Sequence, residues 1–121
     1  MTRTVLVCIA LAAVAGCTMK SAAELRQMPP VAYMSKESVD SVTRCMIDAP
    51  TANMLETATY PQSHKAEFRI GGTAATYYLA TAEPKNGHTY VEIRSQGKSL
   101  WALTESEFYA IVKRCAPPIS E

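Results

Sequence analysis

Apolar residues alternate with charged ones along two short stretches of this chain, KAEFRI at residues 65–70 and TYVEIRS at residues 89–95. Successive side chains of a strand point to opposite faces, so each stretch would carry one apolar and one charged face. That pattern is typical of an antiparallel sheet with one face on a core and the other in water. The apolar members are Ala66, Phe68, Ile70, Val91 and Ile93. We therefore expect an antiparallel sheet at the centre of the fold.

Two further stretches read as strands of the same sheet. TYYLAT at 76–81 is rich in aromatic and β-branched residues, and KSLWAL at 98–103 supplies a fourth strand. Turn signals separate the four stretches, and these are Gly71 with Gly72, PKNG at 84–87, and Gln96 with Gly97. The sequence thus predicts a four-stranded meander over 65–103. MLETATY at 54–60 adds an edge strand or a loop that covers the edge.

The segments on either side of the meander have a helical period. In residues 35–50, Ser35 is the expected cap, Pro50 ends the run, and one face carries Val39, Val42, Cys45 and Met46. In TESEFYAIVKRC, residues 104–115, Thr104 and Glu107 match a capping box and one face carries Phe108, Ile111, Val112 and Cys115. We expect helices near 36–47 and 105–115. The fold class is therefore α+β, with both helices packed on one face of the sheet.

Residues 5–14 form an apolar run, with the basic residue Arg3 before it and the small residues Ala15 and Gly16 after it. A basic start, an apolar centre and small residues form the order of a secretory signal peptide. The run is shorter than the roughly 20 apolar residues that a membrane-spanning helix needs. We therefore expect a signal that is removed, rather than a permanent transmembrane helix.

Val14, Ala15, Gly16 and Cys17 resemble the lipobox of bacterial lipoproteins, which has an aliphatic residue and two small residues before a cysteine. The resemblance covers the first 17 residues and points to no functional family. It implies that the Cys17 thiol receives a diacylglyceryl group, that the signal is cut before Cys17, and that the new amine is acylated. Three acyl chains would anchor the protein far more firmly than one chain, which gives only marginal binding. The other interpretation is an ordinary cleaved signal with a cysteine nearby.

The same resemblance implies where the mature protein lies. Thr18 follows Cys17 at the position where an aspartate favours retention in the inner membrane. We therefore expect an anchor in the outer membrane and a domain that faces the periplasm. The chain then divides into a signal peptide at 1–16, a lipidated tether at 17–34 that contains two stiffening prolines, and a small periplasmic α+β domain at 35–121.

The cysteines divide between these segments. Cys8 leaves with the signal and Cys17 carries the lipid, so Cys45 and Cys115 remain. The periplasm is oxidising, and we expect these two to form a disulfide that links the helices. Zinc is the competing interpretation, but two cysteines without a CxxC pair do not match the spacing of a structural zinc site. We expect no metal and no cofactor.

Few residues suggest catalysis. The two histidines, His64 and His88, lie beside expected turns, where we favour the interpretation of solvated loop residues. The sequence has no G-x-S-x-G elbow and no Walker glycine loop. Its 12 basic and 11 acidic side chains are balanced, which gives no electrostatic reason to expect a nucleic-acid partner. We expect that the protein is not an enzyme.

Four aromatic residues fall on the expected strands, namely Tyr77, Tyr78, Tyr90 and Trp101. If they face outward, they form a possible binding surface, because Tyr and Trp are enriched in interfaces. The interpretation that we favour is cross-strand packing against the helices. Tyr77 and Tyr78 are adjacent, so they point to opposite faces of a strand.

These features lead us to expect a membrane-anchored periplasmic lipoprotein that acts as a non-enzymatic accessory or interaction protein of the cell envelope. Its partners would be the lipid bilayer, through acylated Cys17, and an envelope protein or the cell wall. The alternative is an inhibitor or a small-ligand-binding lipoprotein.

Overall fold

The structure is a computed structural model that describes residues 20–49, 53–72 and 75–119. The described strands form one antiparallel sheet in the order β1-β5-β4-β3-β2. The strands are β1 (Val31–Ser35), β2 (Leu55–Tyr60), β3 (Lys65–Gly72), β4 (Ala75–Lys85) and β5 (His88–Ser95). The helices are α2 (Ala22–Leu25), α3 (Val39–Asp48) and α4 (Glu105–Cys115). The predicted signal peptide and the lipobox with Cys17 lie outside the described residues.

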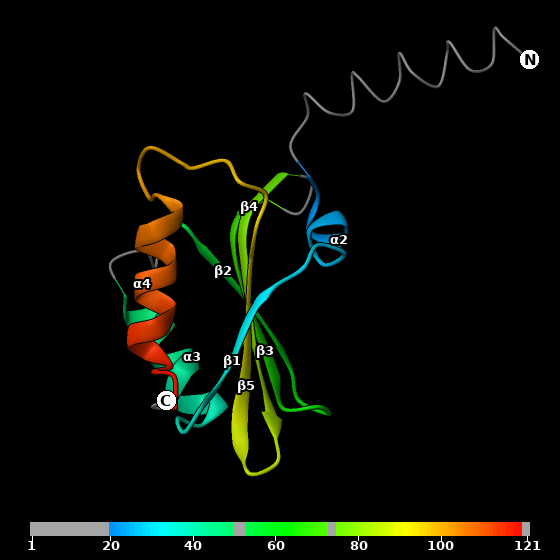
Figure 1. Cartoon of the computed structure of the whole chain (residues 1–121), viewed down its shortest axis with the longest axis vertical. Helices are drawn as coiled ribbons and strands as arrows, with labels where there is room; N and C mark the ends of the chain where they lie inside the picture. The colour runs from blue at the N-terminus through cyan, green and yellow to red at the C-terminus, as the bar shows by residue number, and fades with distance from the viewer. Residues whose placement is uncertain (1–19, 50–52, 73–74, 120–121) are drawn as a thin grey trace, which may run out of the picture.

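The α+β class and the antiparallel sheet are confirmed. Figure 1 shows α3 and α4 on one side of the sheet and the short α2 on the other. Helix α4 spans the residues that the sequence predicted. Helix α3 begins at Val39, three residues later than predicted, because Ser38 rather than Ser35 is its N-cap. The Ser38 side chain accepts a hydrogen bond from the Ser41 amide at 3.1 Å.

The sheet has five strands where the sequence predicted four. The additional strand on one edge is β1, which pairs with β5 so that Val31 lies opposite Ile93. Four of its five residues, 31–34, fall in the segment that was predicted to be a tether. Residues 20–34 belong instead to the folded domain, since Ala22 and Leu25 of α2 are also buried. On the other edge, residues 55–60 form strand β2 rather than a covering loop.

The prediction of a strand at 98–103 is wrong, because these residues form a loop between β5 and α4. One edge of β5 pairs with β4 and the other pairs with β1, so β5 has no free edge for a further strand. Hydrogen bonds to Tyr78 hold this loop in place. The Tyr78 hydroxyl donates to the Leu103 carbonyl at 2.6 Å and accepts from the Leu100 amide at 2.9 Å.

Two glycines shape the turns of the sheet. Asn86 and Gly87, with φ of 53° and 79°, form the two-residue turn between β4 and β5 that the PKNG signal predicted. Gly71, with φ of 102°, lies where the register between β3 and β4 shifts. A Cβ there would lie 2.5 Å from the Ala75 carbonyl oxygen, so only glycine fits this bulge.

The main core lies between the sheet and the two long helices. The rings of Tyr78 and Phe108 stack at its centre with their centroids 5.1 Å apart. Burial of these side chains supplies the hydrophobic free energy that holds both helices on the sheet. The core also contains Phe68, Ile70, Ala80, Val91, Ile93, Val42, Met46, Ile111 and Val112.

The opposite face of the sheet combines a small apolar contact with an ion pair. Leu25 of α2 and Leu79 of β4 are both fully buried. Next to them Glu67 is 1 % exposed, and its carboxylate accepts two hydrogen bonds from Arg26, from Nη2 at 2.7 Å and from Nε at 3.1 Å. Both oxygens of the buried carboxylate are therefore bound by a guanidinium. This contact fixes the segment after α2 to the sheet.

Candidate functional site

A cleft of about 670 Å³ opens where the N-terminus of α3 approaches the sheet. Its walls come from three connections, the segment between β1 and α3 and the turns that follow β2 and β4. The β4–β5 turn lies at the bottom end of the sheet in Figure 1, and the start of α3 lies at the same end. We call this hollow the distal cleft.

The sheet topology brings the two turns of the distal cleft together. Strand β3 starts and β4 ends at this end of the sheet, since Ala66 near the start of β3 pairs with Ala82 near the end of β4. The turn before β3 and the turn after β4 are therefore neighbours. His64 lies in the first turn and His88 directly follows the second, and both are exposed and line the cleft. The sequence placed each histidine beside a turn but did not pair them.

Hydrogen bonds fix the wall between β1 and α3. The Thr89 hydroxyl of β5 donates to the Glu37 carbonyl at 2.5 Å, and Thr89 is only 3 % exposed. The Glu37 amide donates to the hydroxyl of Ser35, which is fully buried. The predicted helix cap Ser35 thus serves as a buried acceptor at the end of β1. This wall is held in place before any ligand binds.

The charges around the distal cleft are of both signs. Lys36 and Lys65 provide two ammonium groups, while Glu37 and Asp40 provide two carboxylates. Threonines from α3, β2 and β5 also line the cleft. The hydroxyls of Thr43 and Thr89 already donate to the carbonyls of Val39 and Glu37, so they can only accept a further hydrogen bond. Within the described ranges, no group of three or more His, Cys, Asp or Glu side chains is placed to hold a metal ion. The arrangement suits hydrogen bonding to a polar partner without strong selection for charge.

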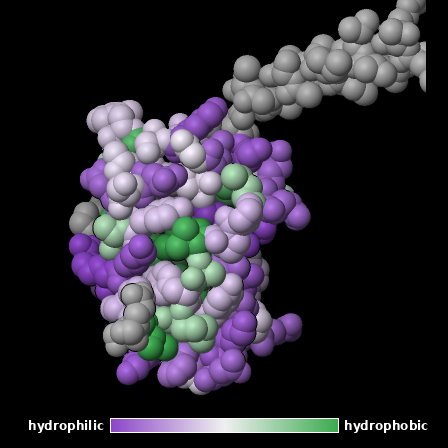
Figure 2. Space-filling model, in the orientation of Figure 1, coloured by the Kyte–Doolittle hydropathy of each residue, from purple (hydrophilic) through white to green (hydrophobic). Residues whose placement is uncertain are grey.

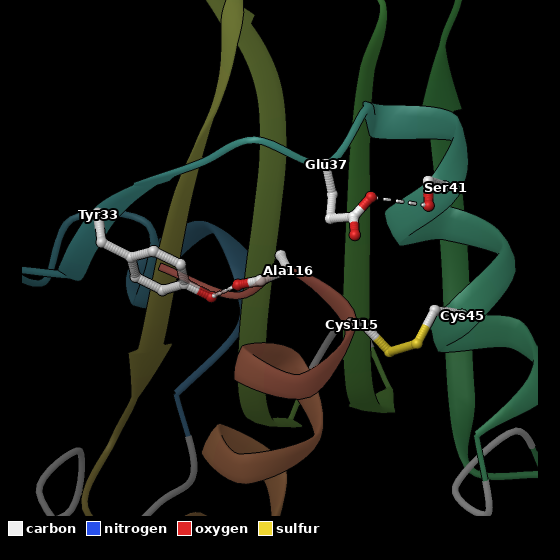
Figure 3. The surroundings of a disulfide bond; sticks show 6 residues. All are labelled: Tyr33, Glu37, Ser41, Cys45, Cys115 and Ala116. Carbon is white, nitrogen blue, oxygen red and sulfur yellow. Dashed lines mark hydrogen bonds between the residues drawn. A yellow bond between two sulfur atoms is a disulfide. The ribbon is translucent and has the colours of Figure 1, made fainter. Parts of the chain in front are cut away.

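The predicted disulfide between Cys45 and Cys115 is present in the structure (Figure 3). Their α-carbons lie 5.3 Å apart, which is within the range that a disulfide spans. Figure 3 also shows Tyr33, whose hydroxyl donates to the Ala116 carbonyl at 2.8 Å. The disulfide therefore fastens the end of α4 to α3, and the Tyr33 hydrogen bond fastens it to β1. Burial also raises the pKa of Tyr33 to about 12.

The four aromatic residues of the predicted binding surface do not form one exposed patch. Tyr78 is 0 % exposed and belongs to the core, and Tyr77 is half-buried against the same core. Tyr90 is half-buried and has the Lys85 ammonium 4.7 Å from its ring centroid. Trp101 is 95 % exposed in the loop between β5 and α4. For Tyr78, the interpretation of packing is correct.

Comparison with protein-family models, with curated proteins and with solved structures finds no match to this chain. In the part of the chain that the structure describes, no helix is long and apolar enough to cross a bilayer. Figure 2 shows a face on which polar residues predominate and apolar residues form small, separate areas. The distal cleft is therefore a better candidate site than any apolar surface of that face.

Proposed function

We propose that this chain is a lipoprotein anchored through Cys17 in the outer membrane, with its domain in the periplasm. It acts as a non-enzymatic accessory protein that binds an envelope protein or the cell wall. The lipobox residues of the sequence support the anchor. The disulfide between the two long helices supports an oxidising compartment, because such bonds persist in the periplasm and are rare in the cytosol.

The observation that carries this proposal is the distance between the distal cleft and the start of the described chain. Lys20 is bound next to Thr76 at one end of the sheet, whereas the cleft opens at the other end. Strand β5 joins these ends and has 8 residues, which corresponds to about 25 Å. A domain that is anchored through Cys17 would therefore present its cleft away from the bilayer.

The cleft chemistry indicates the class of partner. Two lysines and two acidic residues line it, and the other polar side chains are hydroxyls and imidazoles. Such a surface matches a polar peptide segment or a glycan better than a polyanion. Tyr60 at the rim is 43 % exposed and adds an aromatic ring for such a partner.

Site-specific crosslinking in living cells tests this function. A photoreactive phenylalanine derivative is placed at His64 or His88 in the distal cleft, and at exposed Ala110 on α4 as the matched control. We expect both cleft positions to yield the same crosslinked envelope protein or cell-wall fragment, and Ala110 to yield none. Equal crosslinking from all three positions, or from none, would contradict a partner-binding cleft.

The volume of the cleft favours a second candidate function, an inhibitor or small-ligand-binding lipoprotein. Pockets for small molecules typically occupy about 300–1,000 Å³, and the distal cleft lies within that range at about 670 Å³. A thermal-shift panel with small ligands and with lysozymes separates the two functions, because a ligand of the native state raises the melting temperature. Thr59→Arg, at an exposed position of the cleft, should abolish any such rise.

A further inference from the structure

Trp101 is the most exposed large apolar side chain among the described residues. It is 95 % exposed, whereas Ile47, Tyr60 and Val31 are 49 %, 43 % and 42 % exposed. An indole ring is large, and leaving it in water gives up the free energy of its burial. It is also the only tryptophan of the chain. The ring is therefore free to contact a partner.

The loop of residues 96–104 holds Trp101 outward on a firm support. Tyr78, which is fully buried, binds the Leu100 amide on one side of Trp101 and the Leu103 carbonyl on the other, at 2.9 and 2.6 Å. A further hydrogen bond joins the Glu105 amide to the Ser99 hydroxyl at 3.2 Å. The exposed ring is therefore presented by a loop whose backbone is tied to the core.

The start of this loop is also tied to the start of the described chain. The Lys20 amide donates to the side-chain oxygen of Gln96 at 3.2 Å, and the Gln96 amide group donates to the Thr76 carbonyl at 2.6 Å. The Thr76 amide in turn donates to the Lys20 carbonyl at 2.9 Å. In Figure 1 the loop and α2 lie toward the same, upper end of the sheet, opposite the β4–β5 turn.

The length of chain before Lys20 determines how far this end lies from the proposed anchor. Three residue steps separate Cys17 from Lys20, and a fully extended chain spans at most about 11 Å over three steps. The lipidated Cys17 would lie at the level of the phospholipid headgroups. The loop bound to Lys20 would then lie at the bilayer surface.

We propose that the loop of residues 96–104 docks on the phospholipid bilayer, with the Trp101 ring in the interface. This proposal rests on the lipid anchor of the proposed function. Tryptophan is enriched at membrane interfaces, where its apolar ring and its N–H group both find suitable surroundings. Exposed Lys98 and half-buried Lys20 lie at the same end, and their ammonium groups would lie near the lipid phosphates. Docking fixes the orientation of the domain and keeps the distal cleft in the periplasm.

Tryptophan fluorescence tests this docking, because the signal comes from Trp101 alone. The lipidated full chain is reconstituted in vesicles of phosphatidylethanolamine and phosphatidylglycerol, with and without brominated acyl chains. We expect the emission maximum to move to shorter wavelength on reconstitution. We also expect brominated lipids to quench the Trp101 emission. The efficiency of acrylamide quenching should fall several-fold relative to the unlipidated Cys17→Ser variant in detergent-free buffer.

A variant whose only tryptophan lies at another position provides the matched control. In the double variant Trp101→Phe and Gln62→Trp, the fluorophore lies in the exposed β2–β3 turn at the far end of the sheet. It should remain accessible to acrylamide and unaffected by brominated lipids. A lipidated sample in which Trp101 behaves like the Gln62→Trp control would overturn the docking alone. A sample whose N-terminal peptide carries no lipid by mass spectrometry would overturn both the anchor and the docking.

Discussion

The α-carbons of Cys45 and Cys115 lie 5.3 Å apart, and the bond between their sulfur atoms joins α3 to the last residue of α4. Helix α3 also supplies Val39, Asp40 and Thr43 to the wall of the distal cleft. The disulfide therefore holds in place both the helical layer of the fold and one wall of the candidate site.

Reduction of this disulfide should strongly destabilise the domain. The bond closes a loop of 70 residues. The chain-entropy model assigns about 4 kcal/mol to a loop of that length. A loss of that size should lower the melting temperature of a small domain by about 20 °C. Thermal unfolding of the oxidised protein, the reduced protein and the double variant Cys45→Ser with Cys115→Ser measures this effect. Two reactive thiols in the oxidised mature protein would mean that the bond does not form in the cell.

Gly71→Ala should destabilise the protein more than the same substitution at Gly97. Both glycines have positive φ, 102° and 83°, where alanine is strained by about 1 kcal/mol. At Gly71 the new Cβ would also lie 2.5 Å from the Ala75 carbonyl oxygen, whereas at Gly97 it meets no described atom within 4 Å. We expect losses of about 2 kcal/mol or more and about 1 kcal/mol in urea unfolding. Equal losses would argue against the close contact at the bulge.

Arg26→Ala should loosen α2 from the sheet. The substitution leaves the buried Glu67 carboxylate without its two hydrogen bonds from Arg26, and Arg69 Nη1 lies farther away at 3.6 Å. We expect a loss of about 2 kcal/mol, since Arg26 itself is partly exposed. Arg44→Ala on the exposed side of α3 is the control and should change stability by less than about 0.5 kcal/mol. Faster hydrogen exchange at Leu25 would accompany the loss; unchanged exchange would contradict it.

Alkaline pH should destabilise the protein partly through Tyr33. Its pKa is raised from 10 to about 12 in the folded state because the side chain is buried. Below pH 10 both states keep the proton and the stabilisation is complete. Between pH 10 and 12 the unfolded chain loses the proton while the folded protein keeps it, so stability falls. Burial also raises the pKa of Tyr90 and Tyr109, which act in the same direction.

Tyr33→Phe isolates this contribution. The variant loses the hydrogen bond to Ala116 and should be less stable by about 1 kcal/mol at neutral pH. Its stability should then decline less between about pH 9 and about pH 11 than that of the native protein. Urea unfolding at both pH values gives the comparison. An identical decline in the two proteins would mean that Tyr33 ionises alike in the folded and unfolded states.

The regular part of the fold was predictable because its signals are local. Alternation of apolar and charged residues predicted β3 and β5, and the turn residues Asn86 and Gly87 predicted the hairpin between β4 and β5. The capping box of Thr104 predicted the start of α4. The errors concern partners that lie far apart in the chain. Residues 31–35 show little alternation because they form an edge strand whose first two residues are exposed. They nevertheless occupy the edge of β5 that the prediction gave to 98–103.

The candidate site was harder to predict, because its residues are separated in the sequence. His64 and His88 each looked like an isolated loop histidine. The predicted meander could have paired the two histidines, because the start of one strand and the end of the next lie at the same end of an antiparallel sheet. The Thr89 hydrogen bond to Glu37 joins the segment before α3 to β5, and the sequence has no marker for that bond.

The proposed lipid anchor is the basis for the orientation of the domain and for the docking of Trp101. Mass spectrometry of the mature N-terminal peptide, taken from protein purified from outer membranes, tests it. We predict a peptide that begins at Cys17, with a diacylglyceryl group on the sulfur and an acyl chain on the amine, and no trace of residues 1–16. A peptide that begins elsewhere, or one in which Cys17 carries no lipid, would contradict the anchor.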